Sequence, residues 1–167
     1  LMVLRIENLQ DVYLWLMGSL SGRTWSHVSM AAPYVFLGLA LALWLAKDLN
    51  VYLLGEEAAH SLGIDVQRVQ RLVLLIGSLM AAACVAVSGV IGFVGLMVPH
   101  ALRLIVGAEH RRLVFHSLWA GAVFLLLADT LARTVFSPLE IPVGIITAFV
   151  GGPFFIYLLK RGSDFHG

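Results

Sequence analysis

Long uncharged stretches alternate with short clusters of charged residues along this chain. Four stretches contain no Asp, Glu, Lys or Arg: residues 26–46, 72–102, 113–128 and 141–159. The hydrocarbon core of a bilayer is about 30 Å thick, so a helix of about 20 apolar residues crosses it. The pattern therefore predicts transmembrane helices. The second stretch is too long for one span, and we expect a tight turn at Ser88-Gly89 to divide it into two.

The basic residues predict how many times the chain crosses the membrane, because cytoplasmic loops collect Lys and Arg. Five crossings put one set of basic residues on a single side: Lys47, Arg68, Arg71, Arg111, Arg112, Lys160 and Arg161. Only Arg5, Arg23 and Arg133 then fall on the opposite side. A four-span arrangement would separate Arg111 and Arg112 from Lys47. We therefore predict spans near residues 27–46, 69–88, 93–107, 113–133 and 142–160, with a cytoplasmic C-terminus.

Composition agrees with a chain embedded in lipid. Of the 167 residues, 60% are hydrophobic and 13% are charged, against about 25% charged in an ordinary soluble domain. So few charges exclude a soluble surface and also exclude disorder. The net charge of +1 gives no basic surface for nucleic acid, and the lone Cys84 permits neither a disulfide framework nor a thiolate metal site. The predicted fold class is all-α, a polytopic bundle of about five transmembrane helices in one domain, residues 1–167.

Residues 1–26 are expected outside, as an external or interfacial segment. Within them, residues 11–25 are too short and too interrupted by Gly and Ser to span, but Trp15 and Trp25 suit the membrane interface. We expect a re-entrant or surface piece. The chain begins with Leu and its external N-terminus has no signal peptide, so we expect a fragment.

The predicted cytoplasmic loop at residues 47–71 contains a short amphipathic helix. Residues 56–62 are good helix formers with acids in the first turn, and Gly63 stands where a left-handed residue would end the helix. An apolar face combines Leu53, Leu54, Ala58 and Leu62. Such a face is covered by the bilayer or by a protein partner. Glu56 and Glu57 on the polar face disfavour the bilayer, whose surface attracts basic residues.

Several ordered motifs resemble a known family. The run from Glu57 to Gly63 resembles the E-A-A-x-x-x-G coupling loop of ATP-binding-cassette (ABC) importer permeases. Further blocks look like the FecCD branch of that group: Gly89 to Arg103 (GVIGFVGLMVPHALR), Glu109-His110-Arg111, Ala128-Asp129 with Arg133, Glu140 to Gly144 (EIPVG), and Gly151 to Phe154 (GGPF). The resemblance covers nearly the whole chain from about Trp15.

The resemblance implies a bacterial plasma (inner) membrane permease that imports ferric siderophores, haem or cobalamin. Its relatives have ten spans per subunit and work as dimers, so this chain resembles the C-terminal half and pairs with itself or with a homologous permease. The coupling loop would form two short helices in a cleft of a separate ABC ATPase. The ATPase coupling residues implied are Glu56, Glu57, Ala58, Ala59 and Gly63.

Arg133 and Asp129 lie four residues apart near the external end of the fourth predicted span, so they share a helical face. One interpretation is a structural ion pair, since an unpaired charge in a membrane is costly. The resemblance implies a second role, in which Arg133 binds an acidic residue of an extracytoplasmic substrate-binding protein. The two roles are compatible. Glu140 is a second candidate for docking.

Pro99, His100 and Arg103 form a P-H-x-x-R unit at the inner end of the third predicted span. We interpret them, with Asp129, as intramembrane polar or packing residues rather than metal ligands, because no His pair has ligand spacing. The last span carries several Gly and Pro residues: Pro142, Gly144, Gly151, Gly152 and Pro153. They permit close packing, and a Gly-Gly-Pro interruption permits a bend. The resemblance implies a pore or gate role for this span.

The chain carries no phosphate-binding G-x-x-x-x-G-K-[ST] loop, so we expect no enzyme activity, no directly bound cofactor and ATP hydrolysis in the partner subunit. Two alternatives remain. An ion-coupled secondary transporter would carry acidic residues at mid-membrane, and a non-transporting membrane scaffold would need no capped acidic helix in its loop.

Overall fold

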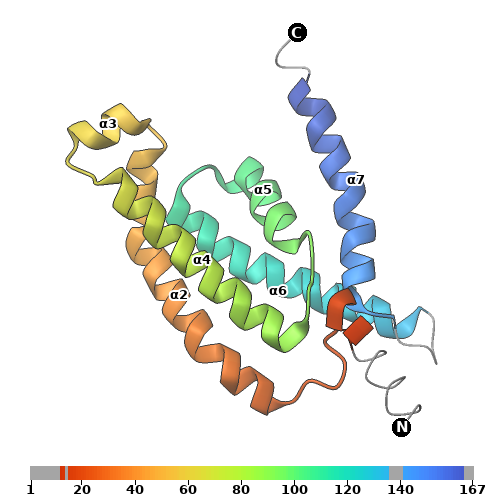
Figure 1. The fold of residues 1–167 in the computed structure, drawn as a ribbon. Coiled ribbons are helices and arrows are strands. Elements are labelled where there is room, and N and C mark those ends of the chain that lie inside the picture. Colours follow the sequence, from red (N-terminus) through yellow and green to blue (C-terminus); the bar gives the residue numbers. More distant parts are fainter. Residues whose placement is uncertain (1–11, 14, 136–140, 164–167) are drawn as a thin grey trace.

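The computed structural model describes residues 12–13, 15–135 and 141–163. The helices of the bundle are α2 (Trp25–Tyr52), α3 (Glu56–Ser61), α4 (Val66–Ser88), α5 (Val94–Val106), α6 (His110–Thr134) and α7 (Val143–Ser163) (Figure 1). Residues 12–13 and 15–17 are also helical. The predicted all-α class is confirmed.

The five longer helices coincide with the five predicted spans, but they are not equally long. Three of them, α2, α4 and α6, are long and apolar enough to cross a membrane. With 13 residues, α5 is only about 20 Å long at 1.5 Å per residue. It therefore falls short of a full crossing, because residues 89–93 form a turn before it and Gly107, with φ of 90°, ends it. The apolar part of α7, Val143–Leu158, is also short.

The predicted loop at residues 47–71 is shorter in the structure. Helix α2 continues past Lys47 to Tyr52, and α4 begins at Val66. The side chain of Asp65 caps α4 by accepting a hydrogen bond from the Arg68 amide at 3.0 Å. The predicted loop bounds followed the charged residues, which mark the edge of the bilayer. The helices extend past that edge, because a helix continues until its backbone hydrogen bonds end. Only residues 53–65 lie outside these two helices.

The helices run alternately in opposite directions. The end of α2 and the starts of α4 and α6 lie together with α3, at what we call the α3 end of the bundle (Figure 1). The opposite, far end holds the starts of α2 and α7 and the end of α6. Helix α2 packs along α4, and α6 contacts α2, α5 and α7. Few side chains are fully buried, and large apolar side chains cover the outside. This surface suits a bundle surrounded by lipid and by other membrane helices.

A backbone junction joins three segments at the far end. The amide of Ser19 donates to Ser88 O at 2.9 Å, Val90 donates to Trp15 O at 3.2 Å, and Gly144 donates to Gly18 O at 3.2 Å. A side chain on Gly18, Gly89 or Gly144 would collide with the opposing backbone. The N-terminal segment is thereby fixed between the α4–α5 turn and the start of α7. Gly89 ends α4 at the turn expected there, Gly92 lies in the same turn, and Gly95 lies inside α5.

Candidate functional site

Helix α3 projects from the bundle as a short helix with a well-defined end. Its last turn closes with hydrogen bonds from Gly63 N to His60 O and from Ile64 N to Ala59 O, both 3.0 Å. This is the Schellman arrangement, which requires a residue with positive φ after the helix. Gly63 has φ of 80°, which confirms the predicted left-handed helix end. The described loop contains this one short helix, where the resemblance implied two.

The exposed surface of the α3 segment combines leucines with acids. Leu54 and Leu62 are 70% and 65% exposed, and Glu56 and Glu57 are also exposed. Ala58 is half-buried, whereas Ala59 is completely buried and holds the helix against its neighbours. The Gly55 and Gly63 turns fix the orientation of this surface beyond the ends of α2 and α4 (Figure 1). An acidic and apolar surface of this kind is suited to protein docking.

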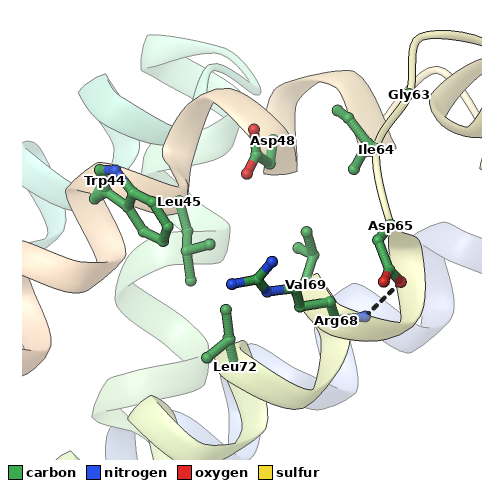
Figure 2. Close-up of a pocket in the computed structure, with 9 residues that line it drawn as sticks. All are labelled: Trp44, Leu45, Asp48, Gly63, Ile64, Asp65, Arg68, Val69 and Leu72. Carbon is green, nitrogen blue, oxygen red and sulfur yellow. Dashed lines mark hydrogen bonds between the residues drawn. The ribbon is translucent and has the colours of Figure 1, made fainter.

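A groove of about 380 Å³ lies beside the connection from α3 to α4 (Figure 2). Trp44, Leu45 and Asp48 of α2 line one side, and Arg68, Val69 and Leu72 of α4 line the other. Gly63, Ile64 and Asp65 border it from the connection itself. Asp48 and Arg68 both face the groove, and the apolar side chains of Leu45, Val69 and Leu72 lie around the Arg68 guanidinium (Figure 2). The connection is therefore not closely packed onto α2.

Arg133 and Asp129 form a two-point ion pair in the last turns of α6. Arg133 Nε lies 2.8 Å from Asp129 Oδ2, and Nη2 lies 3.3 Å from Oδ1. The pair is at the far end, with side chains 42% and 21% exposed. The ion pair expected from the i, i+4 spacing is therefore present, and Arg133 still has surface available to a partner. Glu140, the second docking candidate, lies outside the described residues.

His100 and Arg103 of α5 are both exposed, and His100 faces α7. The His100 ring meets Phe154 of α7 edge-on, with ring centroids 6.5 Å apart. Arg103 is exposed in the last turn of α5, where a positive charge is favoured by the helix dipole. Pro99 lies within the same helix. Across the described ranges, no three His, Cys, Asp or Glu side chains are grouped to hold a metal ion.

The expected Gly-Gly-Pro interruption does not break the last helix. Helix α7 runs continuously from Val143, directly after Pro142, and includes Pro153. Gly151 is buried where a side chain would collide with Phe93, whereas a side chain on Gly152 would meet nothing within 4 Å. Phe93 has φ of 68°, unusual for a large residue. Gly151 thus provides close packing, and the helix persists because one missing amide removes a single backbone hydrogen bond.

A polar cluster joins α2 to α6, through contacts of Asn50 with Glu109 and His110 that the sequence did not predict. Asn50 Oδ1 accepts a hydrogen bond from the His110 amide at 2.8 Å, and Asn50 Nδ2 donates to Glu109 Oε1 at 3.5 Å. Glu109 also caps α6 by accepting from the amides of Arg111 and Arg112. An acidic residue just before a helix signals a cap, but a contact across 59 or 60 residues has no local signal.

These features define a class: a multi-pass helical membrane protein with a short exposed helix in the loop between two long spans. The profile of the FecCD transport family matches residues 1–161. The chain belongs to the FecCD transport family, whose members are permease subunits of the plasma (inner) membrane.

Relatives share close sequence similarity with most of this chain. The cobalamin import system permease protein BtuC of Halobacterium salinarum is 50% identical over 92% of the chain and 41% of its own length. The hemin transport system permease protein HmuU of Yersinia pestis is 44% identical over 95% of the chain and 47% of its own length. The Fe(3+) dicitrate transport system permease protein FecD of Escherichia coli is 44% identical over 96% of the chain and 51% of its own length.

A solved structure shares the fold as well. It is a metal-chelate type ABC transporter in an inward-facing conformation, with a TM-score of 0.85, 36% sequence identity and coverage of 93% of this chain. The match extends over 50% of that chain. The present chain thus spans about half the length of the relatives it matches.

Proposed function

We propose that this chain is the C-terminal part of a permease subunit of an ABC importer, which moves a ferric siderophore or a related metal chelate such as haem or cobalamin into the cytoplasm. The observation that carries the proposal is the α3 surface, a rigid acidic and apolar helix projecting from the end of a FecCD-family bundle. Relatives named for cobalamin, hemin and ferric dicitrate support the substrate class.

In this proposal two soluble partners bind opposite ends of the bundle. A separate ABC ATPase hydrolyses ATP and contacts Glu56, Glu57, Ala58, Ala59 and Gly63 at the α3 end, which is cytoplasmic. A substrate-binding protein docks at the far end through Arg133, with Glu140 as a second contact. A second permease copy or a homologous permease completes the pore beside α7. The chain itself hydrolyses nothing and holds no cofactor.

Co-purification with the ATPase tests the coupling surface. Gly63→Val places a β-branched side chain at positive φ, which strains the end of α3 without a collision, because nothing lies within 4 Å of the added Cβ. Gly107→Val is a matched control, with φ of 90° and the same open space, in the α5–α6 connection. We expect Gly63→Val and Glu57→Lys to lose the ATPase and Gly107→Val to retain it. If the intact permease binds no ATPase, the proposed function is wrong.

The energy source of uptake separates this proposal from an ion-coupled secondary transporter. We expect uptake of a ferric chelate into proteoliposomes to require ATP and to persist when proton and sodium gradients are collapsed. Comparing ferric siderophores, haem and cobalamin as substrates then identifies the chelate. Uptake that follows an ion gradient without ATP would support the alternative instead.

A further inference from the structure

The last turn of α2 makes polar contacts with three other helices at the α3 end. The Tyr52 hydroxyl donates to Glu56 Oε1 of α3 at 3.4 Å and accepts from Gln70 Nε2 of α4 at 3.2 Å. Two residues earlier, Asn50 contacts the start of α6. Helical residues two apart point in nearly opposite directions. The turn therefore holds α3 and α4 on one side and α6 on the other (Figure 1).

The Asn50 carboxamide matches the groups at the start of α6. Its Oδ1 lies 2.8 Å from both the His110 amide nitrogen and His110 Nδ1, which donates in its Nδ1–H tautomer. Its Nδ2 donates to the Glu109 carboxylate that caps the helix. Leaving such partly buried polar groups without partners is unfavourable, because they lose hydrogen bonds that water does not fully replace. This cost favours movement of the α2 end and the α6 start as a unit.

The covalent connection from α3 to α4 transmits a displacement of α3 less directly than the contacts of α2 do. Gly63, Ile64 and Asp65 border the open groove, so side chains do not fill the space between this connection and α2 (Figure 2). The Tyr52 hydroxyl, by contrast, contacts Glu56 directly. A displacement of α3 therefore reaches the last turn of α2 through the short turn at residues 53–55, which closes with a hydrogen bond from Gly55 N to Tyr52 O at 3.1 Å, and through the Tyr52–Glu56 contact beside it.

We infer that Tyr52 and Asn50 are positioning residues that transmit a displacement of α3 to α6. The inference rests on the proposed function, in which an ATPase moves α3. Helix α6 has 25 residues and is about 37 Å long, so it reaches from the Asn50 contact to the Asp129–Arg133 pair at the far end. It also packs against α7. One rigid helix thereby connects the ATPase side with the proposed docking and gate elements.

The test uses the complete transporter, with permease, ATPase and binding protein reconstituted in proteoliposomes, and measures ATP hydrolysis and chelate uptake separately. Tyr52→Phe removes one oxygen atom, and Tyr34→Phe is the matched control on α2, because no hydrogen bond of the Tyr34 hydroxyl is found among the described residues. We expect Tyr52→Phe to retain the ATPase and to lower uptake per ATP hydrolysed about fivefold, the lower end of typical coupling between sites. Tyr34→Phe should leave the ratio unchanged.

Exchanging the amide and the carboxylate between residues 50 and 109 tests Asn50. A purely structural role does not predict that the second substitution restores uptake per ATP hydrolysed. Asn50→Asp places a second carboxylate beside Glu109 and should also lower uptake per ATP about fivefold. Adding Glu109→Gln restores one amide and one carboxylate at the contact and should restore the ratio.

The outcomes separate the inference from the function on which it rests. Normal ATPase binding with an unchanged ratio in Tyr52→Phe and Asn50→Asp overturns the inference alone. Failure of Glu109→Gln to restore the ratio also overturns it. An intact permease that binds no ATPase overturns the proposed function and the inference together.

Discussion

Arg133 keeps 42% of its side chain exposed although its guanidinium makes two hydrogen bonds with Asp129. The ion pair holds the side chain in a fixed direction at the far end of α6. Such a preorganised cation loses little conformational freedom when an acidic partner binds, and its structural role does not exclude a docking role.

Two substitutions separate these roles of the pair. Arg133→Glu reverses the charge offered to the binding protein, and we expect association to weaken at least tenfold while ATPase assembly is retained. Asp129→Asn removes the ion pair but keeps the cation, so association should fall much less. Surface plasmon resonance with the permease in nanodiscs measures both affinities. Unchanged association of Arg133→Glu would contradict the docking role.

The Glu109 carboxyl gives the α6 cap a pH dependence. Desolvation raises its pKa, but hydrogen bonds from the Arg112 and Arg111 amides and from Asn50, together with the Arg112 charge, outweigh this and hold the pKa below its ordinary value of 4.5. A carboxyl whose pKa is lowered in the folded state contributes stability above the unfolded pKa and loses it as the pH falls through the folded pKa.

We therefore expect Glu109→Gln to lower the thermal midpoint at pH 7 and to lose this effect progressively below about pH 4.5. Thermal unfolding in detergent across this pH range measures the difference. If the difference in thermal midpoint between wild type and variant grew as the pH fell, the predicted direction of the Glu109 effect would be wrong.

At the scale of elements, the far-end junction fixes where α7 begins. Val143 and Thr147 are among the most buried residues, and Thr147 donates to Gly144 O at 3.0 Å. Further along, Phe149 and Ile156 are 80% and 68% exposed. Helix α7 is thus anchored at its start, and much of its remaining surface is available to lipid or to a second permease.

Gly144→Ala should weaken this anchor, because the added methyl group would collide with the carbonyl of Met17, a backbone atom that cannot rotate away. We expect a loss of about 1–3 kcal/mol, the usual cost of overpacking. Gly152→Ala, eight residues later in the same helix, meets nothing within 4 Å and should not lower stability, because alanine favours the helix over glycine by about 0.5–1 kcal/mol. Thermal denaturation of the purified variants distinguishes the two, and equal stability would contradict the close approach.

The sequence predicts those elements whose positions and ends depend on residues close together in the chain. Uncharged runs located the five longer helices, and the glycine after an acidic, alanine-rich turn located the end of α3. The short α5 was also predictable, at residues 93–107 against the observed Val94–Val106, because Ser88-Gly89 marks the turn that precedes it. The Asn50 cluster and the Trp15 junction depend on residues far apart in the sequence, and neither has a periodic signal. Packing, rather than composition, brings them together.

The whole molecule is asymmetric from end to end. The α3 end carries exposed acidic residues and leucines. It also carries most of the basic residues near helix ends, including Arg68, Arg71, Arg111 and Arg112. The far end of the described structure has Arg23 and the paired Arg133. Basic residues concentrate on the cytoplasmic side of membrane proteins. We therefore propose that α3 faces the cytoplasm.

Cysteine labelling tests that orientation directly. In a Cys84→Ser background, Leu54→Cys places a thiol on the exposed α3 segment, and Ser21→Cys places one in the exposed turn before α2 at the opposite end. A membrane-impermeant maleimide should label Ser21→Cys in right-side-out vesicles and Leu54→Cys only in inverted ones. The reverse pattern would put α3 outside, where no ATP-driven partner could reach it, and would contradict both the orientation and the proposed import mechanism. Labelling of both positions from one side would instead contradict a membrane crossing by α2, the helix between them.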